Sequence, residues 1–174
     1  AADWPGLPED EATARNQGSI FFAKNASAIA MTCWSVMVSA QGESGVVEQP
    51  RLMEFAGAAD LVLLDVPCSN TGVLARRVEA KYRFSRAGLR GLINVQRQII
   101  ADSLNLLHPQ RGRLLYATCS IDPAENAEQA KWIAQWHPLI VEQEQARQPR
   151  GLPGESASEY NDGGYWAMLK RSQA

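Results

Sequence analysis

The sequence predicts an α/β domain with a mainly parallel sheet and helices on both of its faces. Short apolar segments that suit buried strands alternate with longer segments of helical periodicity. The chain has 174 residues, 45% of them hydrophobic and 21% charged, which is the composition of an ordinary soluble globular protein. We therefore expect residues 1–174 to form a single domain with a substantial core.

The first half of the chain contains weaker secondary-structure patterns than the second half. Residues 19–23 (SIFFA) form a short apolar run that suits a buried strand. Residues 26–41 are apolar on several helical faces and are followed by Gly42, so they predict a helix. Residues 46–47 give a weak strand signal.

The central part of the chain gives sharper signals. Residues 59–67 contain a continuous apolar run, which is typical of a strand covered on both faces in a parallel sheet. Residues 88–107 place leucines and isoleucines three and four positions apart, on one side of a long amphipathic helix. Residues 113–120 predict another apolar strand.

The C-terminal part predicts one more helix and one more strand. Asp122 suits a helix cap, Pro123 suits the first helical position, and Glu125 completes a pattern like a capping box. We expect this helix to run to about Trp136. Residues 165–169 predict the last strand.

Composition excludes several classes of protein. Three cysteines are too few and too dispersed for a disulfide scaffold, and no CxxC pair indicates a zinc site, so we expect no metal. Polar residues interrupt the longest apolar neighbourhood, residues 19–40, which argues against a membrane span. The acidic N-terminus does not fit a secretory signal, so we expect a reducing, cytoplasmic setting.

Two cysteines and one aspartate share an edge of the expected sheet. Ligands bind beyond the carboxyl ends of strands in such sheets, and Asp65, Cys68 and Cys119 all fall there. Cys119 also precedes a helix N-terminus near Pro123, whose partial positive charge favours a thiolate. This thiolate would serve as a nucleophile, but a disulfide or a redox pair fits the same spacing. We interpret Cys33 as a small buried residue.

Charge is unevenly distributed along the chain. The net charge is −2, but residues 76–97 hold seven basic residues and one acid, Glu79. The remaining residues therefore carry a net charge of −8. Such a basic segment would hold a polyanion at one place while the rest of the surface repels it. A solvated helix face explains the same charges equally well if nothing else is considered.

Two longer strings carry a family resemblance. Residues 65–73 read DVPCSNTGV and residues 116–126 read YATCSIDPAEN. They resemble the two signatures of the RNA cytosine-5 methyltransferases, approximately DAPCSGTG and YATCSxxPxEN. Residues 76–83, RRVEAKYR, resemble the basic RRxPxxKWR segment of that family without its proline. Residues 152–154 and 162–167 are similar to the Sun/Fmu branch, which methylates small-subunit (16S) ribosomal RNA.

The resemblance implies a fold, a reaction and a set of site residues. The fold would be the Rossmann-like sheet of an S-adenosylmethionine-dependent methyltransferase, and the substrate would be a cytosine in small-subunit ribosomal RNA. Cys119 would add to C6 of the cytosine, Asp65 would hydrogen-bond the ring near N3, and Cys68 would help to remove the C5 proton or to release the product. The residues that would hold RNA phosphates are Arg76, Arg77, Lys81 and Arg83.

The half of the chain that should bind the donor departs from the family pattern. A Gly-rich turn with a lysine is expected there, but residues 1–6 contain neither the glycine pair nor the lysine. Asn25 stands where an acid would bind the ribose of S-adenosylmethionine, and Asp65 and Pro67 complete the implied donor contacts. We therefore expect an incomplete or divergent cofactor-binding half at residues 1–58 and a catalytic half at residues 59–174.

Two explanations of this departure and two other functions stay open. We favour a piece of a larger enzyme that lacks its first strand and an N-terminal RNA-binding domain over a degenerate donor pocket. A noncatalytic RNA-binding module would use the basic segment, residues 76–97. A thiol-dependent hydrolase or redox protein has less support, because His108 and His137 precede prolines at helix ends and lack a catalytic context.

Overall fold

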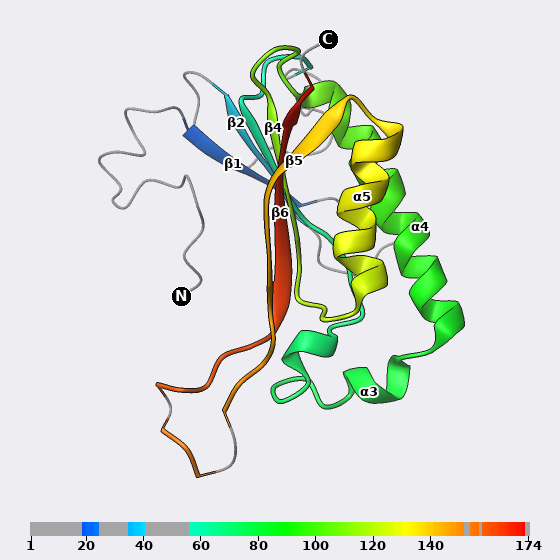
Figure 1. The fold of residues 1–174 in the computed structure, drawn as a ribbon, viewed down its shortest axis with the longest axis vertical. Coiled ribbons are helices and arrows are strands. Elements are labelled where there is room, and N and C mark those ends of the chain that lie inside the picture. The colour runs from blue at the N-terminus through cyan, green and yellow to red at the C-terminus, as the bar shows by residue number, and fades with distance from the viewer. Residues whose placement is uncertain (1–18, 25–34, 41–55, 152–153, 157, 173–174) are drawn as a thin grey trace.

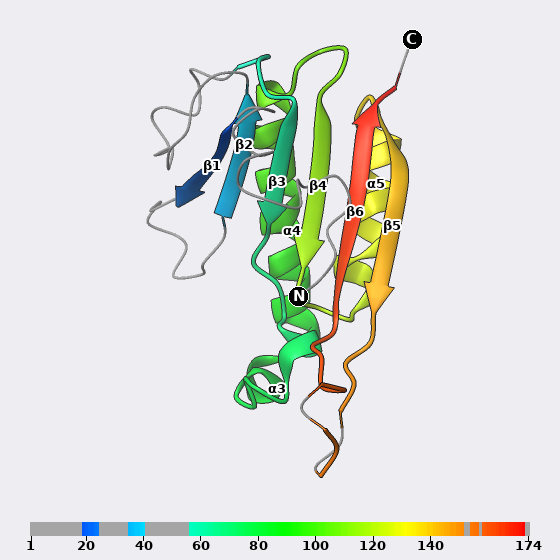
Figure 2. The same ribbon diagram turned by 90° about the vertical axis from the view of Figure 1, so that its left-hand side faces the viewer.

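The computed structural model of the chain describes residues 19–24, 35–40, 56–151, 154–156 and 158–172. Within them, six strands form one sheet in the order β1-β2-β3-β4-β6-β5 (Figure 2). The strands are β1 (Ser19–Lys24), β2 (Ser35–Ala40), β3 (Leu61–Asp65), β4 (Arg113–Thr118), β5 (Leu139–Arg147) and β6 (Gly164–Arg171). The α-helices are α3 (Ala80–Arg83), α4 (Arg86–Ser103) and α5 (Ala127–Trp136), and the 3-10 turns are η2 (Thr71–Val73), η3 (Leu104–Leu106) and η4 (Pro123–Glu125).

The strands pair in a mixed pattern. β3 and β4 are parallel, and the other described pairs (β1 with β2, β2 with β3, β4 with β6, β5 with β6) are antiparallel. Parallel neighbours need a long crossover, which α4 provides between β3 and β4. The expected α/β class is therefore confirmed, but the expected mainly parallel pairing is wrong for the part of the chain that is described.

Both long helices cover the same face of the sheet. α4 and α5 lie side by side against that face in both views (Figures 1 and 2). The expectation of helices on both faces is thus not met by the helices that the structure describes. Ile99 and Ile100 of α4 and Ile133 of α5 are buried against β4, whose Leu114 and Tyr116 are fully buried. Burying each such side chain stabilises the fold by about 1.5–3 kcal/mol.

Most of the predicted elements are confirmed. The helical periodicity over residues 88–107 corresponds to α4 and η3, and the capping pattern at Asp122 begins η4 and α5. The four strands that the sequence predicts at residues 19–23, 59–67, 113–120 and 165–169 correspond to β1, β3, β4 and β6.

Two strands depart from the sequence prediction. The helix expected over residues 26–41 is wrong at its C-terminal end, because Ser35–Ala40 forms β2 between β1 and β3. Backbone pairing on both sides, with β-branched Val36 and Val38, outweighs helical propensity here. Residues 26–34 and 46–47 lie outside the described residues. β5 was not predicted, because it is an edge strand that is mostly exposed and lacks a strong apolar pattern.

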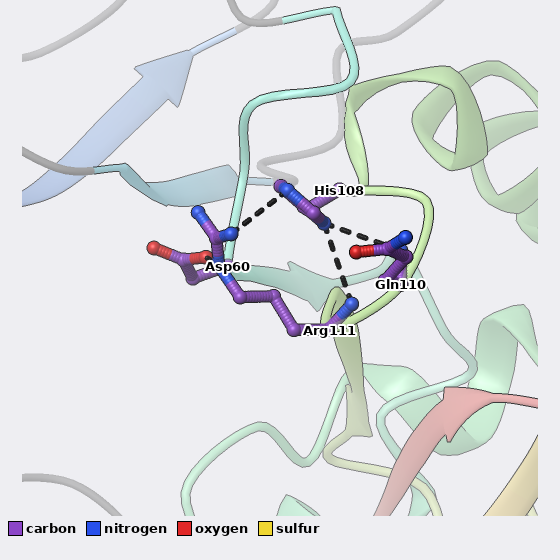
Figure 3. Close-up of polar contacts among 4 residues, drawn as sticks. All are labelled: Asp60, His108, Gln110 and Arg111. Atoms are coloured by element: carbon purple, nitrogen blue, oxygen red, sulfur yellow. Dashed lines mark hydrogen bonds and ion pairs between the residues drawn. The ribbon is translucent and has the colours of Figure 1, made fainter.

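His108 belongs to a turn at the amino end of β4 (Figure 3). Its Nδ1 accepts a hydrogen bond from the backbone N–H of Gln110 at 3.2 Å, and its Nε2 lies 2.8 Å from Nη1 of Arg111. Nε of the same arginine pairs with Asp60 at 2.5 Å. His108 is therefore a turn residue, at the end of β4 opposite to Cys119.

None of the described helices combines the length and the hydropathy that a membrane span requires.

Candidate active site at the carboxyl ends of β3 and β4

Two cysteines from separate strands meet at the carboxyl edge of the sheet. β3 ends at Asp65, and the loop that follows it carries Cys68, while Cys119 directly follows β4. The two Sγ atoms are 3.2 Å apart, with Cys68 buried and Cys119 half-buried. A disulfide bond is about 2.05 Å long, so these are two free thiols in contact. The structure thus brings together the two cysteines that the sequence placed at this edge.

Hydroxyl groups join the two cysteine-bearing loops. Ser69 and Ser120, each of which follows one of the cysteines, place their Oγ atoms 3.2 Å apart. Oγ1 of Thr71 lies 3.0 Å from Oγ of Ser120 and accepts a hydrogen bond from the N–H of Ile121 at 3.1 Å. These contacts fix the separation of the cysteines, because they join the residues that follow Cys68 to those that follow Cys119.

A fully buried carboxylate, that of Glu125, holds the first of these loops. It accepts hydrogen bonds from the N–H of Ser69 at 3.0 Å and from the Oγ of Ser69 at 2.6 Å. Nε2 of Gln96 also donates to Glu125 and to the carbonyl of Pro67, both at 3.0 Å. The loop is therefore tied to α4 through Gln96 and to η4 through Glu125.

The role predicted for Glu125 in a capping box is wrong. Asp122 does cap η4, because its side chain accepts from the N–H of Ala124 at 2.9 Å. The Glu125 carboxylate instead accepts a hydrogen bond from the hydroxyl group of Ser69. Sequence analysis missed this link and missed Gln96, although Gln96 gave a signal: it is a polar residue on the apolar side of α4, and it is fully buried.

The two thiols shift the pKa of each other in opposite directions. A hydrogen bond from the Cys68 thiol to the Cys119 sulfur lowers the pKa of Cys119 below its ordinary value. The same bond, together with burial, raises the pKa of Cys68. The negative charge of the pair is therefore favoured on Cys119, which is the state that a nucleophilic cysteine requires.

Asn70 adds a second contact to Cys119. Its backbone has φ 59°, in the left-handed region, where asparagine is among the few tolerated residues with a side chain. Its Nδ2 donates to the carbonyl of Cys68 at 3.1 Å, and its Oδ1 lies 3.0 Å from the Cys119 sulfur. Oδ1 accepts a hydrogen bond from Cys119 only while that residue is a thiol, so this bond is lost when Cys119 becomes a thiolate. The similar family signature has glycine at this position, so this bridge is a departure from that signature.

We expect Cys68→Ala to raise the pKa of Cys119, because the variant removes the thiol that donates to the Cys119 sulfur. The rate of alkylation of Cys119 by iodoacetamide, followed by mass spectrometry across pH, should have its midpoint at higher pH than in the unchanged protein. Cys68→Ser retains a donor and should show a smaller shift. An unchanged or lower midpoint in Cys68→Ala would contradict the assigned proton.

Asp65 stands beside this pair at the end of β3. Its negative charge acts on Cys119 and opposes the lowering of the pKa of that thiol. The carboxyl group of Asp65 touches solvent, but the protein around it removes enough water to raise its own pKa. It forms no side-chain hydrogen bond with any residue in the described part, so both oxygens stay available to a ligand.

The other two residues expected to bind the methyl donor, S-adenosylmethionine, are Pro67 and Asn25. Pro67 is buried, and its carbonyl is already bonded to Gln96. Asn25 lies outside the described residues. The contacts of Asn25, Asp65 and Pro67 with a donor therefore stay predictions.

The four basic residues expected to bind RNA lie in and before α3, below the carboxyl ends of β3 and β4 (Figure 2). All four are exposed. Arg76 forms an ion pair with Asp162, so this guanidinium is engaged with the loop before β6. Arg77 lies close enough to Cys119 to lower the pKa of that thiol. Lys81 places its Nζ 4.8 Å from the ring centre of Tyr82.

Gly72 lies between the backbones of Cys119 and Gly163, where there is no room for a side chain. Its N–H donates to the carbonyl of Cys119 at 2.9 Å, and its carbonyl accepts from the N–H of Gly163 at 2.8 Å. A Cβ at this position would collide with the carbonyl oxygens of Gly163 and Cys119.

Gly72→Ala is therefore expected to lower the free energy of unfolding by about 1–3 kcal/mol, because backbone atoms would have to move. Gly91→Ala is the matched control: Gly91 lies in α4 with open space around its Cα, and alanine there should stabilise the helix by about 0.5–1 kcal/mol. Urea unfolding measures both changes. Equal stability of the two variants would refute the close approach at Gly72.

Within the described ranges, no three histidine, cysteine, aspartate or glutamate side chains gather as a metal site. Neither histidine accompanies the cysteines, since His108 lies at the other end of β4 and His137 caps the C-terminus of α5 before β5. The described residues therefore give no support to the thiol hydrolase considered from the sequence.

The chain is similar in sequence to a ribosomal RNA methyltransferase. Ribosomal RNA small subunit methyltransferase B of Vibrio cholerae is 39% identical over 137 residues, which are 77% of this chain and 31% of that protein. The chain thus spans about a third of the length of this curated relative.

Solved structures share the fold. The crystal structure of PH0851 is 25% identical, has a TM-score of 0.53, and aligns over 74% of this chain and 31% of its own chain. NSun6 from Pyrococcus horikoshii, solved with SFG, is 19% identical with a TM-score of 0.52, over 76% of this chain and 35% of its own. These likenesses confirm the Rossmann-like class of fold.

A family model described as 16S rRNA methyltransferase RsmB/F matches residues 27–159. This match covers most of the chain, including both cysteine-bearing loops and the basic segment. The chain belongs to the RsmB/F family of 16S rRNA methyltransferases.

Proposed function

We propose that this chain is the catalytic domain of an enzyme that methylates C5 of cytosine in small-subunit ribosomal RNA, with S-adenosylmethionine as the donor. The observation that carries the proposal is the contact of the Cys68 and Cys119 sulfurs, 3.2 Å apart beside Asp65. Membership of the RsmB/F family supports ribosomal RNA as the substrate and a methyl group as the transferred group. The reducing cytoplasm, which keeps both thiols free, is the setting that suits this pair.

Cys119 supplies the nucleophile in this reaction. C5 of cytosine is too weak a nucleophile to take a methyl group by itself. The Cys119 thiolate adds to C6, the electron pair of the C5–C6 double bond moves into the ring toward N3, and C5 becomes nucleophilic. The lowered pKa of Cys119 provides the thiolate, because the Cys68 thiol donates to its sulfur.

Asp65 and Cys68 carry out the proton transfers of this reaction. Asp65 would hydrogen-bond N3 of the ring and supply a proton there when the adduct forms, and burial, which raises its pKa, favours the protonated form that this step needs. The adduct turns Cys119 into an uncharged thioether, so the charge that held the proton on Cys68 disappears. Cys68 then gives that proton to solvent and takes the C5 proton, the C6–S bond breaks as the C5–C6 double bond reforms, Cys119 leaves as a thiolate, and the proton on N3 returns to Asp65.

The methyl donor would lie against the same edge of the sheet. When bound, S-adenosylmethionine supplies the methyl group as an electrophile attached to a sulfonium sulfur. The unengaged carboxyl group of Asp65 fits a polar ligand at this place. We assign Asn25, Asp65 and Pro67 as the residues that would hold the donor, with Asn25 at the ribose.

The target cytosine must leave its stack to reach the two thiols, since a paired base hides C6. Arg77, Lys81 and Arg83 lie on the exposed surface next to the site, where they would hold the phosphates of the displaced strand. Arg76 would reach RNA only by exchanging its ion pair with Asp162 for a phosphate.

The test is methyl transfer to undermethylated small-subunit ribosomal RNA by the full protein that contains this chain. We expect label from S-adenosylmethionine to appear as 5-methylcytosine. Absence of transfer, with RNA binding but no donor binding in calorimetry, would overturn the proposal in favour of a noncatalytic RNA-binding module.

A further inference from the structure

A cavity of about 240 Å³ lies next to the two thiols, and the reaction described above assigns no ligand to it. Cys68 and Asn70 form the wall that it shares with the active site. The opposite walls come from α3 and from the first turns of α4. Neither Asp65 nor Cys119 lines the cavity, so it adjoins the reacting centre on the side of Cys68.

One side of the cavity is apolar. Leu89 and Leu92 of α4 line it, and Phe84 stands at its rim with 42% of its surface exposed. The flat face of a nucleobase stacks well on an exposed aromatic ring of this kind, whatever the base. The chemistry of this side therefore suits a base that has left its stack.

The other side is charged. Arg77 and Arg83 line the cavity, and neither guanidinium forms an ion pair with a residue in the described part of the chain. They belong to the segment 76–97, which has seven basic residues against one acid. That acid, Glu79, also lines the cavity and offers an acceptor to the amino group of a base.

We propose that this cavity binds one nucleotide of the RNA substrate adjacent to the target cytosine, with its base on Phe84 and Leu92 and its phosphate on Arg77 and Arg83. The inference rests on the proposed function in taking single-stranded RNA as the ligand and in placing the target cytosine at the two thiols. Lining and charge agree, because an apolar wall beside two guanidinium groups that form no ion pair with a described residue matches a base beside a phosphate. The wall shared through Cys68 and Asn70 makes the nucleotide a neighbour of the reacting base.

The test combines protein and RNA changes. A set of single-stranded fragments of 16S ribosomal RNA is prepared, each with a single abasic nucleotide at a different position. Fluorescence anisotropy measures the affinity of each fragment for the unchanged protein and for Phe84→Ala. At one position, removal of the base should weaken binding by the unchanged protein about 10-fold. The same removal should have no further effect on Phe84→Ala, which is itself about 10-fold weaker on intact RNA.

Tyr82→Ala is the matched control, because Tyr82 is 80% exposed, close in sequence and absent from the walls of the cavity. Any loss that it causes should add to the abasic effect at every position, since the two changes do not share a contact. Arg83→Gln should weaken binding of every fragment and reduce the salt dependence by about one phosphate contact.

Additive effects of Phe84→Ala and every abasic position would overturn the inference, as would equal affinity of Phe84→Ala and the unchanged protein. Methyl transfer is measured separately on the same fragments. Transfer without coupling at Phe84 would reject the cavity and keep the proposed reaction. Coupling without transfer would keep the cavity and reject the reaction.

Discussion

Cys119→Ala is expected to abolish methyl transfer, with a loss of at least about ten-thousand-fold, because it removes the thiolate that adds to C6 and the pKa of the remaining Cys68 thiol is raised. Cys68→Ala should behave differently: the adduct with RNA forms but breaks down slowly, so protein and RNA stay joined under denaturing conditions. Label transfer measures the first change, and a denaturing gel with labelled RNA measures the second.

The control for both variants is Cys33→Ala, which removes a thiol that the proposed mechanism does not use. It should transfer methyl groups at the normal rate and leave no persistent adduct. Full activity of Cys119→Ala would refute the role of Cys119. Persistent adducts in Cys119→Ala, and none in Cys68→Ala, would mean that the roles of the two cysteines are reversed.

Glu125→Gln is expected to lower the free energy of unfolding by about 3 kcal/mol, because it replaces an acceptor of several buried hydrogen bonds by a group that is partly a donor. Ser69 and Gln96 would then face an amide N–H in place of a carboxylate oxygen. For a chain of this length, Tm should fall by about 6–12 °C. Methyl transfer should fall as well, since Glu125 positions the loop that carries Cys68.

Glu128→Gln is the matched control, because Glu128 lies three residues later, in the first turn of α5, and is exposed to solvent. Its change in unfolding free energy should stay within about 0.5 kcal/mol. Urea unfolding and thermal melts of both variants distinguish the effect of losing a buried carboxylate from the effect of losing a negative charge. Equal stability of the two variants would contradict the assignment of Glu125 as the support of the Cys68 loop.

The sequence predicted the elements that depend on local pattern. α4 has a clear apolar side, and β3 and β4 are apolar runs, so their positions followed from periodicity alone. The shared edge of Asp65, Cys68 and Cys119 followed in turn, because β3 and β4 are parallel and end on the same side.

Other features depend on contacts between distant residues and could not be predicted in this way. Ser35–Ala40 becomes a strand because β1 and β3 flank it, not because of its own pattern. The direction in which Glu125 turns depends on Ser69, a residue 56 positions earlier. The cavity beside Phe84 likewise exists only where α3 and α4 meet the Cys68 loop.

Which of the two cysteines keeps its proton could be inferred only from the structure. Proximity to a helix N-terminus suggested a thiolate at Cys119, but the first segment there is the short turn η4. The main cause of the lowered pKa of Cys119 is the thiol of Cys68, 3.2 Å away. Spacing along the chain gives no sign of which thiol donates.

The most direct test of this account uses RNA in which cytidine is replaced by 5-fluorocytidine. Fluorine at C5 cannot leave as a proton does, so the methylated adduct cannot be released. Peptide mapping by mass spectrometry should find one nucleotide, bearing the added methyl group, attached to Cys119. Attachment to Cys68, or methylation of the RNA with no attached peptide, would contradict the account.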